Sequence, residues 1–198
     1  EALEDQLGFR PGECQGKTLL IIGGAGGVGS IAIQLAARYF GLTVIATAGR
    51  EQSANWCDAM GAHHLVDYRQ PLQPQLDAVS DGQMDGIFVT QNLDDYWQAA
   101  CQAVAPLGGI CAIVDARGPL DLNPLKPKSA RFSWEFMFTR PLFGRRMQQQ
   151  GDRLAELATL VDKGVIQTTV SEGLGPINAN NLKEAHRRLE SGSTIGKL

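Results

Sequence analysis

The 198-residue sequence predicts an α/β fold, a doubly wound parallel sheet of about six strands with helices on both faces. The apolar run Leu19–Ile22 leads directly into a glycine-rich turn and then into an amphipathic helical pattern. Further apolar runs alternate with helical patterns along the chain, as in repeated strand–helix–strand units. The composition, 43% hydrophobic and 20% charged, is that of an ordinary globular protein, so residues 1–198 are expected to form one domain.

The turn after Ile22 matches the pattern G-x-G-x-x-G at Gly24, Gly26 and Gly29. In this pattern the first glycine permits a tight turn, the second lets a pyrophosphate approach the backbone, and the third lets the helix pack closely on the strand. The phosphates then bind the free N–H groups at the helix N-terminus. Because the chain contains 23 glycines, the inference depends on the flanking strand and helix, and the alternative is a turn that binds nothing.

The next elements follow from periodicity and from glycine or proline breaks. Residues 2–8 are predicted to be the end of a helix, which Gly8 caps. Apolar residues at helical spacing predict a helix over residues 28–39, ending near Gly41. Strands are predicted over residues 43–47, 63–66, 86–90 and 110–114, and helices over residues 52–60, 72–79 and 94–104. Residues 116–128 contain three prolines and are predicted to form a loop.

The last third of the chain begins with an aromatic segment that alternates Phe132, Trp134, Phe136 and Phe138. This alternation favours an edge strand, and an apolar edge strand is a natural place for a second copy of the chain to pair. A homodimer through Phe132 to Phe138 is therefore one expectation, while core packing is the simpler explanation for at least half of the rings. Helices are also predicted over residues 152–163 and 178–189, and short strands over residues 165–170 and 195–198.

The residues after the second predicted strand distinguish between the two nicotinamide cofactors. An acidic residue there, about 20 residues past the glycines, would accept a hydrogen bond from the ribose 2′-hydroxyl of NAD. The sequence instead has Thr47-Ala48-Gly49-Arg50, whose small residues leave room for a 2′-phosphate that Arg50 can pair with. This favours NADP over NAD. The alternative is that Arg50 is a solvated charge at the start of the next helix, where Glu51 weakens its field.

The ends of two later strands are also expected to face the ligand. In doubly wound sheets, ligands bind outside the carboxyl ends of the strands, at the point where the strand order reverses. Thr90 and Gln91 end one predicted strand, and Val114 and Asp115 end another. The alternative for each of these residues is the ordinary polarity of a strand-to-loop junction.

Charge and composition argue against several other classes of protein. The formal net charge of −3 supplies no general attraction for nucleic acid. No apolar run approaches the ~18 residues needed to cross a bilayer, and the N-terminus is acidic, unlike a secretory leader, so a cytoplasmic protein is expected. His63-His64 is not expected to bind a metal, because adjacent strand residues point to opposite faces. The four cysteines are predicted to be buried, reduced thiols; they are Cys14, Cys57, Cys101 and Cys111.

Five segments carry a resemblance to a known family, and the resemblance covers nearly the whole chain. The segments are Gly23–Ser30, Thr47–Arg50, Met60–Ala62, Phe132–Arg140 and Ala185–Lys197. They resemble the cofactor-binding region of medium-chain dehydrogenase/reductases, in the quinone oxidoreductase and zinc-type alcohol dehydrogenase-like branch. The resemblance implies an NADP(H)-binding Rossmann domain of an oxidoreductase. Such an enzyme transfers hydride between NADPH and a quinone, an enone, or an alcohol or carbonyl substrate. A non-catalytic module that senses NADP(H) is the alternative.

The resemblance also implies a β-rich substrate domain that precedes this chain and receives its final strand. The chain alone is then expected to bind cofactor and to be inactive. Because the metal ligands of the family lie mainly in that other domain, no metal site is expected here, and no catalytic residue is assigned.

Carried over by position, the resemblance assigns a set of cofactor-binding residues; they are Ala25, Gly26, Gly27 and Val28 along the pyrophosphate, Thr47 and Arg50 beside the adenosine 2′-phosphate, Tyr68 on the adenosine side, and Thr90 and Val114 near the ribose and nicotinamide. The aromatic segment Phe132–Phe138 is expected near the nicotinamide or at a dimer edge.

Overall fold

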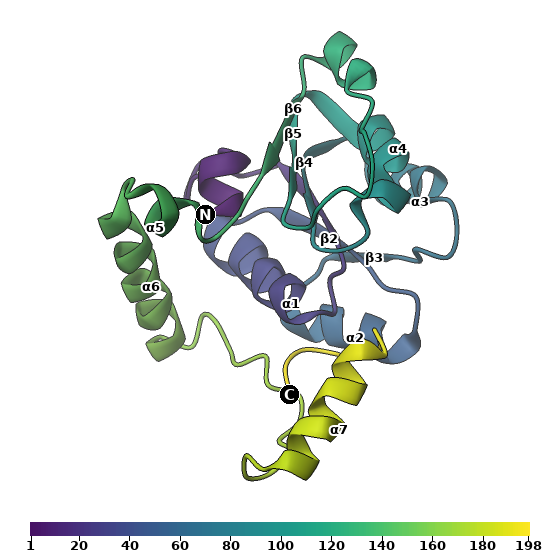
Figure 1. Cartoon of the computed structure of the whole chain (residues 1–198). Coiled ribbons are helices and arrows are strands. Elements are labelled where there is room, and N and C mark those ends of the chain that lie inside the picture. Colours follow the sequence, from purple (N-terminus) through teal and green to yellow (C-terminus); the bar gives the residue numbers. More distant parts are fainter.

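The computed structural model describes residues 1–198 and contains a six-stranded sheet in which every neighbouring pair of strands is parallel (Figure 1). The strand order is β3-β2-β1-β4-β5-β6. The strands are β1 (Thr18–Ile22), β2 (Thr43–Thr47), β3 (His64–Val66), β4 (Met84–Val89), β5 (Val104–Ala112) and β6 (Arg131–Trp134). The order reverses between β1 and β4, so the predicted doubly wound fold is confirmed.

The sheet is covered on both faces, and the two faces are filled by different helices. The helices are α1 (Gly27–Gln34), its continuation η2 (Leu35–Phe40), α2 (Glu51–Met60), α3 (Leu72–Val79) and α4 (Leu93–Ala103). Leu19 and Ile21 of β1 pack with side chains of α1, η2 and α2, whereas Leu20 and Ile22 pack with those of α3 and α4. Successive strand residues point to opposite faces, so a strand buried on both sides must be apolar at every position.

Several elements differ from the sequence-based expectation. The 116–128 segment contains a short 3₁₀ helix, η3 (Asn123–Lys128). Only the first half of the aromatic segment is a strand, because its partner β5 ends at Ala112. The last hydrogen bond between the two runs from the amide of Glu135 to the carbonyl of Ala112. Beyond that point a continued strand would have no partner. The short strands expected over residues 165–170 and 195–198 are reduced to isolated bridges, Val170 with Lys197 and Gly26 with Gly196.

The aromatic rings accordingly divide into two groups. Phe132 packs edge-to-face against Trp97 of α4, with ring centroids 5.0 Å apart, and against Trp134 at 4.6 Å. Phe136 and Phe138 pack on each other at 5.5 Å in the turn before α5 (Thr139–Phe143), and both are more than half exposed. Core packing therefore explains Phe132, and the second group remains at the surface.

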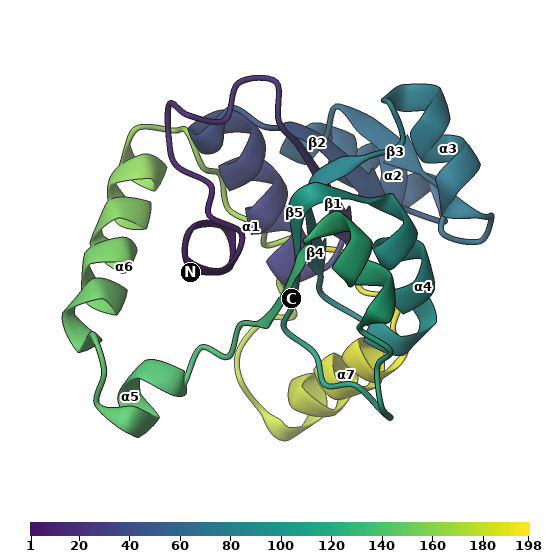
Figure 2. The ribbon, with the colours of Figure 1, turned by 90° about the horizontal axis from the view of Figure 1, so that it is seen from above.

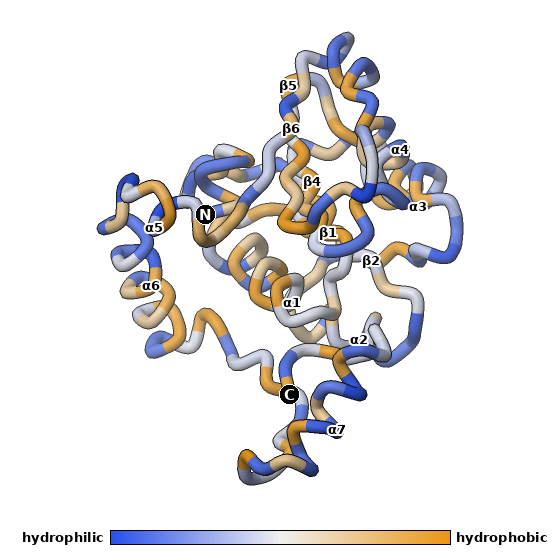
Figure 3. Tube along the Cα trace, viewed as in Figure 1, coloured by the Kyte–Doolittle hydropathy of each residue, from blue (hydrophilic) through white to orange (hydrophobic).

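The remaining helices lie at the periphery of the sheet. They are η1 (Ala2–Gln6), α6 (Met147–Asp162) and α7 (Ala179–Glu190), and Figure 2 shows η1 between α6 and the sheet. Arg153 of α6 pairs with Glu4 and Asp5 of η1, at 2.5 and 2.8 Å. The hydropathy colouring of Figure 3 is apolar along the central strands and α1 and mostly hydrophilic along α7. No helix has the length and apolar character required to span a membrane.

A buried amide attaches the segment after α6 to the central unit. Gln34 has no exposed surface; its Oε1 accepts the backbone N–H of Gln167 at 2.7 Å, and its Nε2 donates to the Gln167 carbonyl at 3.1 Å. Arg38 donates to the carbonyl of Val165 at 3.2 Å. These contacts fix residues 165–167 against α1, from where the chain continues toward the glycine turn.

Replacing Gln34 by alanine should lower the free energy of unfolding by about 2–3 kcal/mol, because two backbone polar groups of Gln167 lose their partner. Urea denaturation followed by circular dichroism measures the change. Gln148→Ala is the matched control, since that exposed side chain bonds only to Asp152, and it should change stability by less than about 0.5 kcal/mol. Equal effects of the two substitutions would contradict the structural role given to Gln34.

Candidate functional site

The glycine turn begins where β1 ends, and neighbouring strands hold it on both sides. Gly23 has a φ of +87°, a left-handed conformation that glycine adopts without strain. Its N–H donates to Oγ1 of Thr47, at the end of β2, over 3.0 Å. The hydroxyl of Thr90, just after β4, donates to the carbonyl of Ile22 over 2.8 Å. The structure therefore brings Thr47 and Thr90 to the turn, as expected for the carboxyl edge of a parallel sheet.

The three glycines of the motif serve different needs. A Cβ atom on Gly29 would lie 2.6 Å from the carbonyl oxygen of Gly24, and one on Gly24 would lie 2.9 Å from Cβ of Ala46. Helix and strand therefore pack too closely for either glycine to carry a side chain. A Cβ on Gly26 would meet only the Gly23 carbonyl oxygen, at an ordinary 3.6 Å. The protein itself does not require Gly26, which is what is expected if its missing side chain leaves room for a ligand.

The first turn of α1 presents unpaired N–H groups beside this space. Gly26 is the N-cap and provides no side-chain cap, and the amides of Gly27, Val28 and Gly29 donate to no backbone carbonyl. The first amides of a helix lack intrahelical partners and form its positive end. Together they form a site suited to an anion such as a phosphate.

Two residues outside the predicted site, one in α1 and one in α2, stabilise the turn through hydrogen bonds. Ser30 is fully buried, and its hydroxyl donates to the carbonyl of Gly26 over 2.7 Å. Trp56 of α2 donates its indole N–H to the same hydroxyl over 2.8 Å. Ser30 follows the motif directly and could have been noticed in the sequence, whereas nothing local in the sequence marks Trp56.

The adenosine side of the site is formed at the end of β2. A Cβ atom on Gly49 would lie 2.5 Å from the ring of Tyr68, so this ring lies over Gly49 with 39% of the residue exposed. Arg50 is the N-cap of α2 and is exposed; one of its Nη atoms donates to the carbonyl of Ser193 over 2.8 Å. Thr47 is only 2% exposed and lies beneath the turn. Tyr68 and Arg50 thus face solvent at this end, and Thr47 supports the backbone.

The nicotinamide side lies farther along the same edge. Val114 and Asp115 follow β5, which is separated from β1 by β4. The carbonyl of Val114 accepts the indole N–H of Trp134 over 3.2 Å, and Asp115 is exposed. Because β5 lies two strands away from β1, the expected site extends over several strand ends rather than one cluster.

The cysteines and histidines do not form a reactive or metal-binding group. All four cysteines are free and buried, and burial raises the pKa of Cys57 to about 12 and that of Cys101 and Cys111 to about 11. These thiols stay protonated at neutral pH and are weak nucleophiles. Nδ1 of His63 accepts the backbone N–H of Val44 at 3.0 Å. No three His, Cys, Asp or Glu side chains lie together in a way that could hold a metal ion, so the residues present do not fit zinc.

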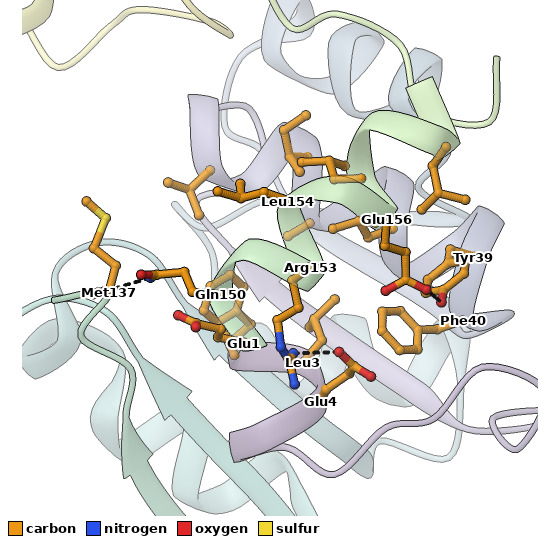
Figure 4. Close-up of a pocket in the computed structure, with 18 of the residues that line it drawn as sticks. Glu1, Leu3, Glu4, Tyr39, Phe40, Met137, Gln150, Arg153, Leu154 and Glu156 are labelled. Atoms are coloured by element: carbon orange, nitrogen blue, oxygen red, sulfur yellow. Dashed lines mark hydrogen bonds and ion pairs between the residues drawn. The ribbon is translucent and has the colours of Figure 1, made fainter. Parts of the chain in front are cut away.

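An apolar cavity of about 620 Å³ lies on the other side of α1, between η1, α1 and α6. Its rim carries paired polar groups: Arg153 with Glu4, and the Tyr39 hydroxyl with Glu156 (Figure 4). The hydrogen bond from Tyr39 to Glu156 raises the pKa of the tyrosine to about 12. Gly27, Val28 and Lys197 line the end of this cavity that adjoins the glycine turn.

Comparison with known proteins places this geometry among dehydrogenases. Residues 60–198 match the family described as zinc-binding dehydrogenase. A zinc-type alcohol dehydrogenase-like protein of Staphylococcus aureus is 41% identical over 194 residues, covering 98% of this chain and 58% of that protein. A Rhizobium etli structure described as that of a zinc-dependent alcohol dehydrogenase protein has 41% identity and a TM-score of 0.91, covering 99% of this chain and 58% of that one.

A more distant structure shares the fold. The quinone oxidoreductase of Escherichia coli, solved in complex with NADPH, has 24% identity and a TM-score of 0.76, and the match covers 91% of this chain and 55% of that one. The chain thus spans less than two thirds of the length of each of these three proteins.

Gly29→Ala should destabilise the chain by more than about 2 kcal/mol, because the new methyl group would overlap the Gly24 carbonyl. Gly151→Ala is the matched control: Gly151 lies within α6 with open space around it, and alanine there should stabilise the chain by ~0.5–1 kcal/mol. Chemical denaturation of both variants measures the difference. A Gly29→Ala variant as stable as the wild type would refute the close packing of α1 on β1.

Proposed function

Because the chain belongs to the zinc-binding dehydrogenase family of medium-chain dehydrogenase/reductases, we propose that it binds NADP(H) at the glycine turn and orients the cofactor for hydride transfer. The observation that carries the proposal is the anion site at the start of α1, where three unpaired amides adjoin a glycine that the protein's own packing does not require. The pyrophosphate occupies this place.

NADP is favoured over NAD by the residues at the end of β2. Ala48 and Gly49 stand where an NAD-binding site has an acidic residue, and Tyr68 over Gly49 offers a flat surface for the adenosine. Arg50 uses one N–H on the Ser193 carbonyl and keeps other donors for a 2′-phosphate. The related fold of the Escherichia coli quinone oxidoreductase was solved with NADPH, which agrees with this choice.

The bound nicotinamide supplies or accepts the hydride, and this chain's residues bind and orient it. Quinones, enones and alcohol or carbonyl compounds are the substrate classes proposed for the complete protein, from its likeness to zinc-type alcohol dehydrogenase-like and quinone oxidoreductase proteins. Because the chain spans 58% of the Staphylococcus aureus relative, turnover is expected to require the remainder of the protein. The four free, buried cysteines agree with a cytoplasmic location.

Calorimetric titration of the chain with NADPH, NADP⁺ and NADH tests the proposal directly. We expect NADPH to bind with a Kd below about 1 mM, and more tightly than NADH. Failure of every nicotinamide dinucleotide to bind at that concentration would overturn the proposal.

Arg50→Ala should weaken NADPH binding by ~1.5–3 kcal/mol and leave NADH binding nearly unchanged, because only NADPH carries the 2′-phosphate. Arg145→Ala, which removes an exposed arginine of the turn before α6, is the control and should alter neither affinity. Isothermal titration of both ligands against both variants gives the four comparisons. Equal losses for NADPH and NADH in Arg50→Ala would remove Arg50 from the 2′-phosphate site.

We further propose that two copies of the chain pair along the free edge of β6 and the segment that follows it, in which Phe136, Met137 and Phe138 are more than half exposed. Sedimentation velocity at concentrations on the order of 100 µM should then show a dimer, and a Phe136→Ser/Phe138→Ser variant should shift it toward monomer. Leu182→Ser on α7 is the control and should leave the dimer intact. A wild-type chain that remains monomeric would rule out pairing through this edge.

A further inference from the structure

The end of the chain lies directly on the glycine turn. We call residues Ser193–Lys197 the C-terminal clasp. The amide of Gly196 donates to the carbonyl of Ala25 over 2.8 Å, and Gly26 and Gly196 form a parallel bridge. Behind it, the amide of Lys197 donates to the Thr169 carbonyl, and the Lys197 carbonyl accepts the amide of Ser171, both at 2.8 Å. The clasp is thus held between the glycine turn on one side and Thr169 and Ser171 on the other.

The geometry of the clasp is specific at Gly196. This residue is buried and has a φ of +62°, and a Cβ atom there would lie 2.9 Å from the Trp56 ring and would overlap the Thr169 carbonyl. The same Trp56 supports the turn through Ser30 and the carbonyl of Gly26. One indole therefore sets the position of both the turn and the clasp.

This arrangement places a lysine over the proposed pyrophosphate site. A Cβ atom on Gly27 would lie 2.6 Å from Nζ and 2.7 Å from Cδ of Lys197, so the lysine side chain crosses the first residue of α1. None of the ten ion pairs of the chain includes Lys197. An unpaired ammonium at the positive end of a helix is electrostatically unfavourable unless an anion lies between them.

The clasp also reaches the other end of the site. The carbonyl of Ser193 accepts the N–H of Arg50, the residue proposed to recognise the 2′-phosphate. Arg50 bonds to the first residue of the clasp and Lys197 is its last residue, so the two cations are linked through the same five-residue segment.

We propose that the C-terminal clasp is part of the dinucleotide site and that Lys197 contacts the pyrophosphate of the cofactor. The inference rests on the proposed NADP(H) binding and adds a residue far from the glycine motif in sequence. The pyrophosphate is common to NADP(H) and NAD(H), so Lys197 contributes to affinity for both, whereas Arg50 contributes to the choice between them.

Lys197→Met tests this contact, because methionine keeps an unbranched apolar stem over Gly27 and removes only the charge. Titrations of the 198-residue chain would use NADPH, NADH, ADP and adenosine 2′-monophosphate. Lys197→Met should lower the affinity for NADPH, NADH and ADP roughly ten-fold. It should leave the affinity for adenosine 2′-monophosphate unchanged, since that ligand has no pyrophosphate. Arg50→Ala should show a different pattern, with lower affinity for adenosine 2′-monophosphate and NADPH and unchanged affinity for ADP and NADH. Lys197→Arg should recover most of the affinity.

Lys183→Met, on the exposed surface of α7, is the matched control and should bind all four ligands as the wild type does. If the wild-type chain binds NADPH and Lys197→Met binds NADPH and ADP with unchanged affinity, the Lys197 contact is wrong while the proposed function stands. If Lys197→Met weakens all four ligands alike, the lysine acts on the fold of the site and the pyrophosphate contact is again wrong. If the wild-type chain binds no nicotinamide dinucleotide, the proposed function fails, and the contact with it.

Discussion

The close approach of α1 to the end of β1 is the constraint on which the rest of the structure depends. The helix can begin where it does only because Gly29 and Gly24 carry no side chains at their contacts with the turn and with Ala46. β1 is in turn buried on both faces, with Leu19 and Ile21 on one side and Leu20 and Ile22 on the other. The central strand thus fixes the sheet, and the glycines place the helix N-terminus at its carboxyl edge.

Polar contacts around the turn serve mainly to hold the backbone in place. The hydroxyls of Thr47, Thr90 and Ser30 all bond to main-chain groups of the turn or of the strand end before it. The groups near the turn that these hydroxyls do not use are backbone amides, an aromatic ring and two cations. Such a set is suited to the pyrophosphate and base of a nucleotide. A protein with these groups can bind and orient a cofactor, while the reacting atoms belong to the cofactor and its substrate.

The peripheral parts of the chain are attached by a different kind of interaction. α6 contributes only Leu160 to the buried set and α7 contributes none, whereas Arg140 and Arg153 form ion pairs with Glu1, Glu4 and Asp5. Partly exposed ion pairs stabilise less than apolar burial does. The buried amide of Gln34 is therefore important, because it ties the segment after α6 to the central helix and so supports the position of the C-terminal clasp.

The sequence by itself determined the central α/β unit, because fully apolar strands, a glycine turn and a helical stripe are local patterns with local physical causes. It identified Gly24 to Gly29 as the turn and placed Thr47 and Thr90 at the strand ends that adjoin it. Tertiary structure alone decided where the aromatic strand stops, since Phe136 and Phe138 alternate like strand residues but have no partner beyond Ala112. It also decided that Trp56, Gly196 and Lys197 meet at the turn. The contacts of Gly196 with Ala25 and Trp56, and of Lys197 with Gly27, join residues more than a hundred positions apart, which no periodicity in the sequence can predict.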